Sequence, residues 1–141
     1  MKTRIAAFVI AVIIAANLGY SQVPQKKFAT KEQKVELAKK NLMIGLHSEN
    51  TGLVESCVKM VAKVKLFAPS ADVAELQEVL DELSVTHPSA TVRYKAYIAS
   101  NICSDPEWFA KENSVVTADE DQFFIKAARR LQQKLFGLNS F

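Results

Sequence analysis

The sequence predicts an all-α protein, built either as a short array of helical hairpins or as a compact bundle of five to six helices. Three observations predict this class. Apolar residues recur at spacings of three and four along most of the chain, capping residues stand at the breaks between these stretches, and no stretch shows sustained strand alternation. With 141 residues, four glycines and four prolines, the chain suits one domain and is not collagen-like or dominated by linkers.

The N-terminal segment has the pattern of a secretory signal peptide. A basic start precedes an uncharged apolar run over residues 5–16, and the small Gly19 and Ser21 stand near its end. We therefore expect a signal peptide over residues 1–21 and export to the periplasm or the extracellular space, with no membrane contact after cleavage. The alternative is an uncleaved membrane anchor. The apolar run over residues 5–16 is shorter than the roughly 20 apolar residues that a membrane-spanning helix needs, which favours the signal peptide. Residues 22–30 show no periodicity and predict a flexible lead-in.

The charge of the chain argues against nucleic acid and anionic membranes as partners. Removing residues 1–21 takes away two of the 18 basic residues and none of the 15 acidic ones, so the net charge falls to +1. A nearly balanced domain lacks the basic excess that attracts polyanions.

The first predicted unit covers residues 31–68. Thr30 and Gln33 form a capping box that starts its first helix. The turn over residues 47–52 is polar and supplies the cap of the second helix. Two neighbouring stripes make that second helix apolar over a wide arc, which predicts packing against more than one neighbour. The first stripe is Leu53, Cys57, Met60, Val64 and Phe67, and the second is Val54, Val58, Val61 and Lys65.

The second predicted unit covers residues 70–103. Pro69 ends the preceding helix, and Ser70 is expected to cap the next one. The turn over residues 86–89 then separates two apolar stripes. These are Val73, Leu76, Leu80 and Leu83 in its first helix, and Val92, Ala96, Ala99 and Cys103 in its second.

The third predicted unit, over residues 105–138, is shorter at its start. Asp105 before Pro106 is an N-cap with proline in the first helical position. Thr117 and Glu120 form a second capping box, which predicts the start of the last helix. The expected apolar stripe of that helix is Phe124, Ala128, Leu131, Leu135 and Leu138.

The first two units resemble each other. An offset of 38 pairs Leu42 with Leu80, Val54 with Val92, Val58 with Ala96, Met60 with Ile98, and Val61 with Ala99. The segment Thr91-Val92-Arg93-Tyr94-Lys95-Ala96 resembles the start of the second helix in HEAT-type repeats, and Leu53–Val58 matches it with Glu55 in place of the arginine. The chain over residues 31–137 also looks like small exported bacterial helical-repeat proteins without an assigned function.

The resemblance implies an α-solenoid fragment of about two and a half repeats that binds another protein, and it implies no chemistry. The stunted third unit departs from the repeat pattern. The alternative is an ordinary five- or six-helix bundle with two similar hairpins.

The histidines and cysteines are not expected to form a metal site or a disulfide. His47 and His87 lie in turns without a ligand set around them. Cys57 and Cys103 lie on apolar stripes, where free cysteine behaves as a small hydrophobe. The repeat register offsets them by roughly 12 Å, beyond the roughly 7 Å limit for bridged Cα atoms.

No catalytic centre or cofactor is expected. The sequence contains no nucleophile elbow and no glycine-rich phosphate loop. Acidic clusters such as Asp81–Glu82 and Asp119–Asp121 are interpreted as solvated helix faces or helix N-terminal charge, like Asp105 and Glu107. The basic residues Lys59, Lys63, Lys126, Arg129 and Arg130 are interpreted as solvated faces as well.

Four residues are the candidates for partner binding: Arg93, Tyr94, Tyr97 and Trp108. The first three lie on the second helix of the second unit, and Trp108 follows within about one turn of its end. Second helices line the concave face of solenoids, and Tyr, Trp and Arg dominate binding hot spots. The alternative is that Tyr97 and Trp108 fill space beneath the short third unit.

These observations favour an exported, non-enzymatic module that binds an unidentified protein. A small-ligand carrier or a hydrolase with a cavity between helices is the first alternative, and a membrane-tethered structural protein with an uncleaved leader is the second.

Overall fold

The computed structural model describes residues 30–111, 113–116, 119 and 122–137, and these residues form an all-helical fold without strands. The predicted signal peptide, and the predicted lead-in except for Thr30, lie outside the described residues. No helix among the described residues combines the length and the apolar character that a membrane span requires. The predicted fold class is therefore confirmed for the described part of the chain.

The first hairpin consists of α2 (Lys31–Leu46) and α3 (Thr51–Phe67). Its start confirms the predicted capping box: Gln33 N–H donates to Thr30 Oγ1, and Thr30 N–H donates to Gln33 Oε1. Asn50 caps α3 by accepting the N–H of Leu53 at 3.1 Å. These caps satisfy N–H groups that have no partner within the helix.

The second hairpin consists of α4 (Ala74–Thr86) and α5 (Ala90–Ser104). The prediction that Ser70 caps this unit is wrong, because α4 begins only at Ala74. The chain first turns after α3, and Asp72 Oδ1 then accepts the N–H of Ala74 at 3.1 Å. Ser89 caps α5 through the N–H of Val92, as the polar turn between the helices suggests.

The third unit consists of α6 (Pro106–Ala110), α7 (Asn113–Val116) and α8 (Phe123–Phe136). Asp105 caps α6 and Pro106 takes the first helical position, as predicted. Thr117 and Glu120 lie outside the described residues. The predicted start of the last helix near residue 117 is wrong, because Asp119 and Gln122 are not helical and α8 begins at Phe123. Asp119 Oδ1 accepts the N–H of Gln122 just before that start.

The buried side of α3 differs from the stripe named first in the sequence. Leu53 is 47% exposed, whereas Val54, Val58 and Val61 are fully buried. The prediction that α3 packs against more than one neighbour is confirmed, because α3 contacts α2, α5 and α6. Packing from several sides buries the neighbouring stripe, and spacing alone does not distinguish the two.

The stripe predicted for the last helix is also partly wrong. Leu135 is 56% exposed, and Leu138 lies outside the described residues. The helix α8 contacts α5, α6 and α7, so three neighbours set its buried side. The buried residues of α8 are Phe123, Phe124, Ala127 and Leu131.

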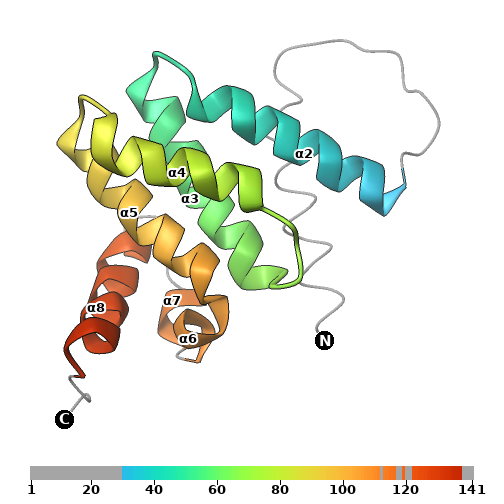
Figure 1. The fold of residues 1–141 in the computed structure, drawn as a ribbon. Coiled ribbons are helices and arrows are strands. Elements are labelled where there is room, and N and C mark those ends of the chain that lie inside the picture. Colours follow the sequence, from blue (N-terminus) through green and yellow to red (C-terminus); the bar gives the residue numbers. More distant parts are fainter. Residues whose placement is uncertain (1–29, 112, 117–118, 120–121, 138–141) are drawn as a thin grey trace.

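The two hairpins lie side by side, with α4 next to α2 and α5 next to α3 (Figure 1). The third unit packs below them in this view, and α6 contacts both α3 and α5. In a regular repeat array, the third unit contacts the second one alone. Here it also reaches the first, so the three units share one hydrophobic core.

Candidate interaction surface

The helix α5 exposes two tyrosines on its outward side. Tyr94 is 53% exposed and Tyr97 is 48% exposed, and their spacing of three places them on the same side of the helix. The opposite side of the helix is packed against its neighbours. Its buried residues are Val92, Ala96, Ile98, Ala99, Ser100, Ile102 and Cys103. The structure thus brings two of the four predicted partner-binding residues to the surface together.

Arg93 has a structural role in the turn that precedes α5. Its Nη1 donates to the carbonyl oxygens of His87 at 2.6 Å and Pro88 at 2.9 Å. The same turn is held by Ser89 N–H, which donates to His87 Nδ1 at 3.1 Å. Arg93 therefore holds the α4–α5 connection that precedes Tyr94 and Tyr97.

Trp108 belongs to the contact between α6 and α8. The Arg130 guanidinium lies 4.2 Å from the centre of the indole ring, and Arg130 Nε donates to the Trp108 carbonyl at 3.1 Å. In return, Trp108 Nε1 donates to the Arg130 carbonyl at 3.3 Å. This position agrees with the alternative interpretation of Trp108 as a space-filling residue. The half-exposed Tyr97 does not fill space in this way.

Two of the basic residues interpreted as solvated faces contact aromatic rings instead. Arg130 stacks on Trp108, and Lys63 Nζ lies 5.7 Å from the centre of the Phe123 ring. That interpretation is wrong for both, because α8 brings Arg130 to α6 and the Phe123 ring to α3. Partial burial lowers the pKa of Lys63 by desolvating its ammonium group.

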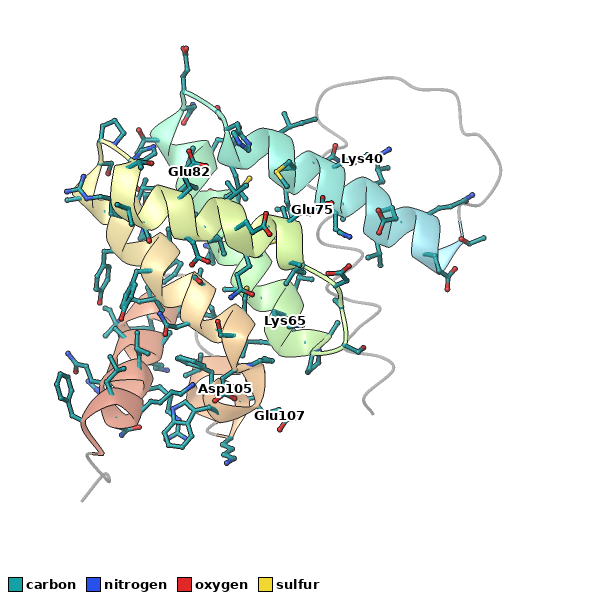
Figure 2. The ribbon with its side chains drawn as sticks, viewed as in Figure 1. Lys40, Lys65, Glu75, Glu82, Asp105 and Glu107 are labelled. Atoms are coloured by element: carbon teal, nitrogen blue, oxygen red, sulfur yellow. The ribbon has the colours of Figure 1, made fainter. Side chains whose placement is uncertain are left out.

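The outward side of α4 is acidic, and α4 packs against α5, the helix that carries the two tyrosines. Four acids, Glu75, Glu78, Asp81 and Glu82, are exposed on a helix that carries no lysine or arginine, and Glu75 and Glu82 are labelled along it in Figure 2. The two helices are joined at their surface by the hydrogen bond of Ser100 Oγ to Asp81 Oδ1. A second bond joins Gln77 Nε2 to Ser104 Oγ at 2.7 Å.

We call this region the acidic–tyrosine surface. It consists of Glu78, Asp81, Glu82, Val85, Tyr94 and Tyr97, and its Val85 is 77% exposed. The sequence interpretation treated the acids as an ordinary solvated face and did not join them to the tyrosines. One pattern in the sequence could have drawn attention to them, namely a 13-residue helix with four acids and no base.

A shallow groove of about 360 Å³ separates α2 from α4. Met43, Ile44 and Leu76 supply its apolar lining, and acids and bases alternate around it. Lys39 is paired with Glu36 at 3.2 Å, and Lys40 and Glu75 come from opposite helices (Figure 2). Among these described lining residues, only the Lys39–Glu36 pair is joined, and charges of both signs line the groove, so they do not form a site for a ligand group of one charge.

The histidines take part in local contacts. His47 Nδ1 lies 2.8 Å from the Met43 carbonyl oxygen, and His87 holds the α4–α5 turn. Among the described residues, no three or more His, Cys, Asp or Glu side chains gather in a way that could hold a metal ion.

The two cysteines are buried and free. Burial raises the pKa of the Cys103 thiol to about 12 and also raises that of Cys57. Both are therefore thiols at neutral pH and poor nucleophiles. The absence of a disulfide between them stays a prediction, which thiol labelling of the unfolded, non-reduced protein tests.

Comparison with family models, with curated proteins and with solved structures found no match to this chain.

Proposed function

We propose that this chain is an exported, non-enzymatic helical-repeat protein that binds another protein through the outward side of α5. The observation that supports this function is the pair Tyr94 and Tyr97, each about half exposed on a helix whose opposite side is packed. Tyrosine is enriched at binding hot spots because its ring gives a large contact area at a low entropic cost, and its hydroxyl can still bond at the rim.

The HEAT-type arrangement is part of the proposal. Its support is the pairing of like helices, α2 with α4 and α3 with α5. The ion pair of Lys95 with Glu55 joins residues 40 positions apart, close to the sequence offset of 38 between the two units. The third unit, which packs on both hairpins, then closes the array.

The test is crosslinking of the tagged protein in the producing cells, followed by mass spectrometry. The variant Tyr94→Ala/Tyr97→Ala should lose a discrete crosslinked partner, because it removes both exposed rings. Arg93 is left unchanged, because its loss would release the turn. A matched control is Leu37→Ala/Ile44→Ala, which removes two exposed apolar side chains from α2. A partner lost equally in both variants, or no partner at all, contradicts the proposal.

The groove between α2 and α4 supports a second candidate function, a small-ligand carrier. Its volume is sufficient for a small organic molecule, at the lower end of the usual range of ligand pockets. A ligand screen by thermal shift, with Met43→Trp as the variant that fills the groove, distinguishes this function. The tethered alternative is tested by the mass of the mature protein, which must retain residues 1–21 if the leader stays attached.

A further inference from the structure

We infer that the partner of the acidic–tyrosine surface is a second copy of this chain, which docks there through the outward side of its helix α8. The inference rests on the proposed function, since it names the occupant of the same surface. It follows from the distribution of charge and of exposed apolar side chains over the described helices.

The outward side of α8 is basic and unusually apolar for a surface helix. Phe136 is 70% exposed and Ile125 54%, and their spacing of eleven residues, about three turns, places them on the same side of the helix. Leu135 is exposed as well, but it lies on the side of the buried Leu131. The helix carries four basic residues and no acidic one. It forms one end of the helical array, and terminal units of such arrays need a polar outer face to stay soluble alone. Two large apolar side chains on such a face indicate a surface that something covers.

Two of the four bases of α8 are available to a partner. Arg130 stacks on Trp108, and Lys134 pairs with Asp105 at 2.8 Å, so these two serve the contact with α6. Arg129 is exposed on the outward side of the helix, and Lys126, one turn before it, is half-buried. Within the residues that the structure describes, neither has a side-chain hydrogen bond or ion pair.

The acids of α4 are available in the same sense. Among the described residues, the carboxylates of Glu75, Glu78 and Glu82 have no hydrogen-bond or ion-pair partner, whereas Asp81 accepts from Ser100. The helix carries no base of its own. The net charge of the chain is only +3, yet α4 carries acids without a base and α8 carries bases without an acid. The helix α5 packs against both α4 and α8.

The two surfaces complement each other in charge and in apolar area. One presents carboxylates together with Val85, Tyr94 and Tyr97, and the other presents Arg129, with Lys126 at its edge, beside Ile125 and Phe136. Opposite charge around an aromatic and aliphatic centre is the arrangement of specific interfaces, in which the centre supplies affinity and the rim supplies register. Both halves are present on one chain, so a second copy satisfies both, and a two-fold dimer would form the contact twice.

The experiment is sedimentation velocity of the purified protein over a range of micromolar concentrations, at low and at high salt. We expect a dimer whose dissociation constant rises about tenfold or more with salt, because the rim charges are screened. The variants Glu78→Lys/Glu82→Lys and Lys126→Glu/Arg129→Glu should each raise the dissociation constant of the dimer by at least about tenfold. Tyr94→Ala/Tyr97→Ala should also raise it, because this variant removes the aromatic centre of the interface.

The decisive sample contains both charge reversals. An equimolar mixture of the two charge variants, or one chain carrying both, should associate again, because the reversed surfaces are complementary. Glu49→Lys and Lys40→Glu are matched controls, since they reverse exposed charges outside both surfaces and should leave the dissociation constant unchanged. Circular dichroism of every variant checks that the helices are intact.

Three outcomes overturn the inference: a monomer at every concentration at low salt, a dimer indifferent to the charge or tyrosine variants, or no recovery when both reversals are combined. Its failure is separable from that of the proposed function. If the protein is monomeric and Tyr94→Ala/Tyr97→Ala still loses a crosslinked partner of another mass, the inference fails and the proposed function stands. If the protein dimerises through another surface and no crosslink depends on the tyrosines, both fail.

Discussion

Where α3 meets α5, small side chains lie in the contact between two long helices, whereas in the third unit large rings fill the space between the short helices α6 and α7 and the longer α8. Ala62 of α3 and Ala96 and Ala99 of α5 are fully buried. Gly45 likewise allows α2 and α3 to pack closely, since a Cβ at this position would lie 2.3 Å from Cys57 Sγ. In the third unit the fully buried side chains are larger, notably Phe109 and Phe123.

The contacts between cations and aromatic rings also distinguish the third unit from the two hairpins. In the described part of the chain, every aromatic ring with a cation above it belongs to α6 or α8: Lys63 and Lys95 lie over Phe123 and Phe124, and Lys111 and Arg130 lie over Trp108. The helices α6 and α7, with five and four residues, cannot present a long apolar stripe to α8. Large rings of α6 and α8, with cations held over their faces, provide the contact area of this unit.

The largest effect should come from Phe109→Ala, which empties the centre of the third unit. The ring is fully buried, so we expect a loss of about 3–5 kcal/mol in the free energy of unfolding. Denaturant unfolding should be followed both by Trp108 fluorescence and by circular dichroism. Because the units share one core, the two transitions should coincide, and separate transitions would show that α6–α8 unfold independently. Leu37→Ala, at an exposed position of α2 outside both proposed surfaces, is the control, with a change within about 0.5 kcal/mol.

Gly45→Ala tests the close approach in the hairpins. The added Cβ would meet Cys57 Sγ, and we expect a loss of about 1–3 kcal/mol, reduced by up to about 1 kcal/mol from the better helix propensity of alanine. Repeating the substitution in a Cys57→Ala background should remove most of the penalty. Gly52→Ala, whose Cβ would meet nothing closer than 3.4 Å, should be harmless. An equal cost at both glycines would contradict the explanation.

Arg130→Ala tests the cation–ring contacts of the third unit. It removes the stack on Trp108 and the bond to the Trp108 carbonyl, so we expect a loss of about 1–2 kcal/mol. The protein has one tryptophan, and its emission should shift to the red as the indole gains water. Arg129→Ala, which alters the neighbouring exposed position, should change neither the stability of the monomer nor the emission.

Asp105→Asn should have the smallest effect and depends on pH. A hydrogen bond from Lys134, and then one from the Trp108 N–H, hold the pKa of Asp105 below its usual value near 4. The ionised form therefore stabilises the fold at neutral pH, and this contribution is lost as the pH falls through the lowered pKa.

At neutral pH we expect the free energy of unfolding of the wild type to exceed that of Asp105→Asn by less than about 1 kcal/mol, because the Asp105–Lys134 ion pair is exposed. In acid this difference should vanish. Unfolding curves across this pH range measure it. Glu107→Gln removes a neighbouring exposed carboxylate as a control. A difference that persists in acid would mean that the amide disturbs the cap itself.

Local features of the fold were predictable, and the partners of each helix side were not. The capping box at Thr30, the proline start at Pro106 and the stripe from Val92 to Cys103 were all confirmed. The cap assigned to Ser70 and the burial of Leu53 and Leu135 were wrong. For α3 and α8, the stripe that is buried depends on where three neighbours lie, and periodicity does not contain that information.

The candidate surface shows the same division. Tyr94 and Tyr97 were identified from the sequence, whereas Arg93 and Trp108 are engaged in contacts within the chain. The acids of α4 were assigned to solvent, because a sequence shows a charged helix without showing what lies beside it. Their place on the helix that packs beside α5 depends on the antiparallel packing of α4 on α5, through Asp81 with Ser100 and Gln77 with Ser104.

By itself, the sequence determined the all-helical class and most helix boundaries, because caps, prolines and apolar spacing act over three or four residues. Only the tertiary structure decided which stripe of α3 and α8 is buried, that the third unit packs on both hairpins, and that the acidic helix α4 packs beside the tyrosine-bearing helix α5. These outcomes depend on contacts between residues far apart in the chain, whose geometry no local spacing encodes.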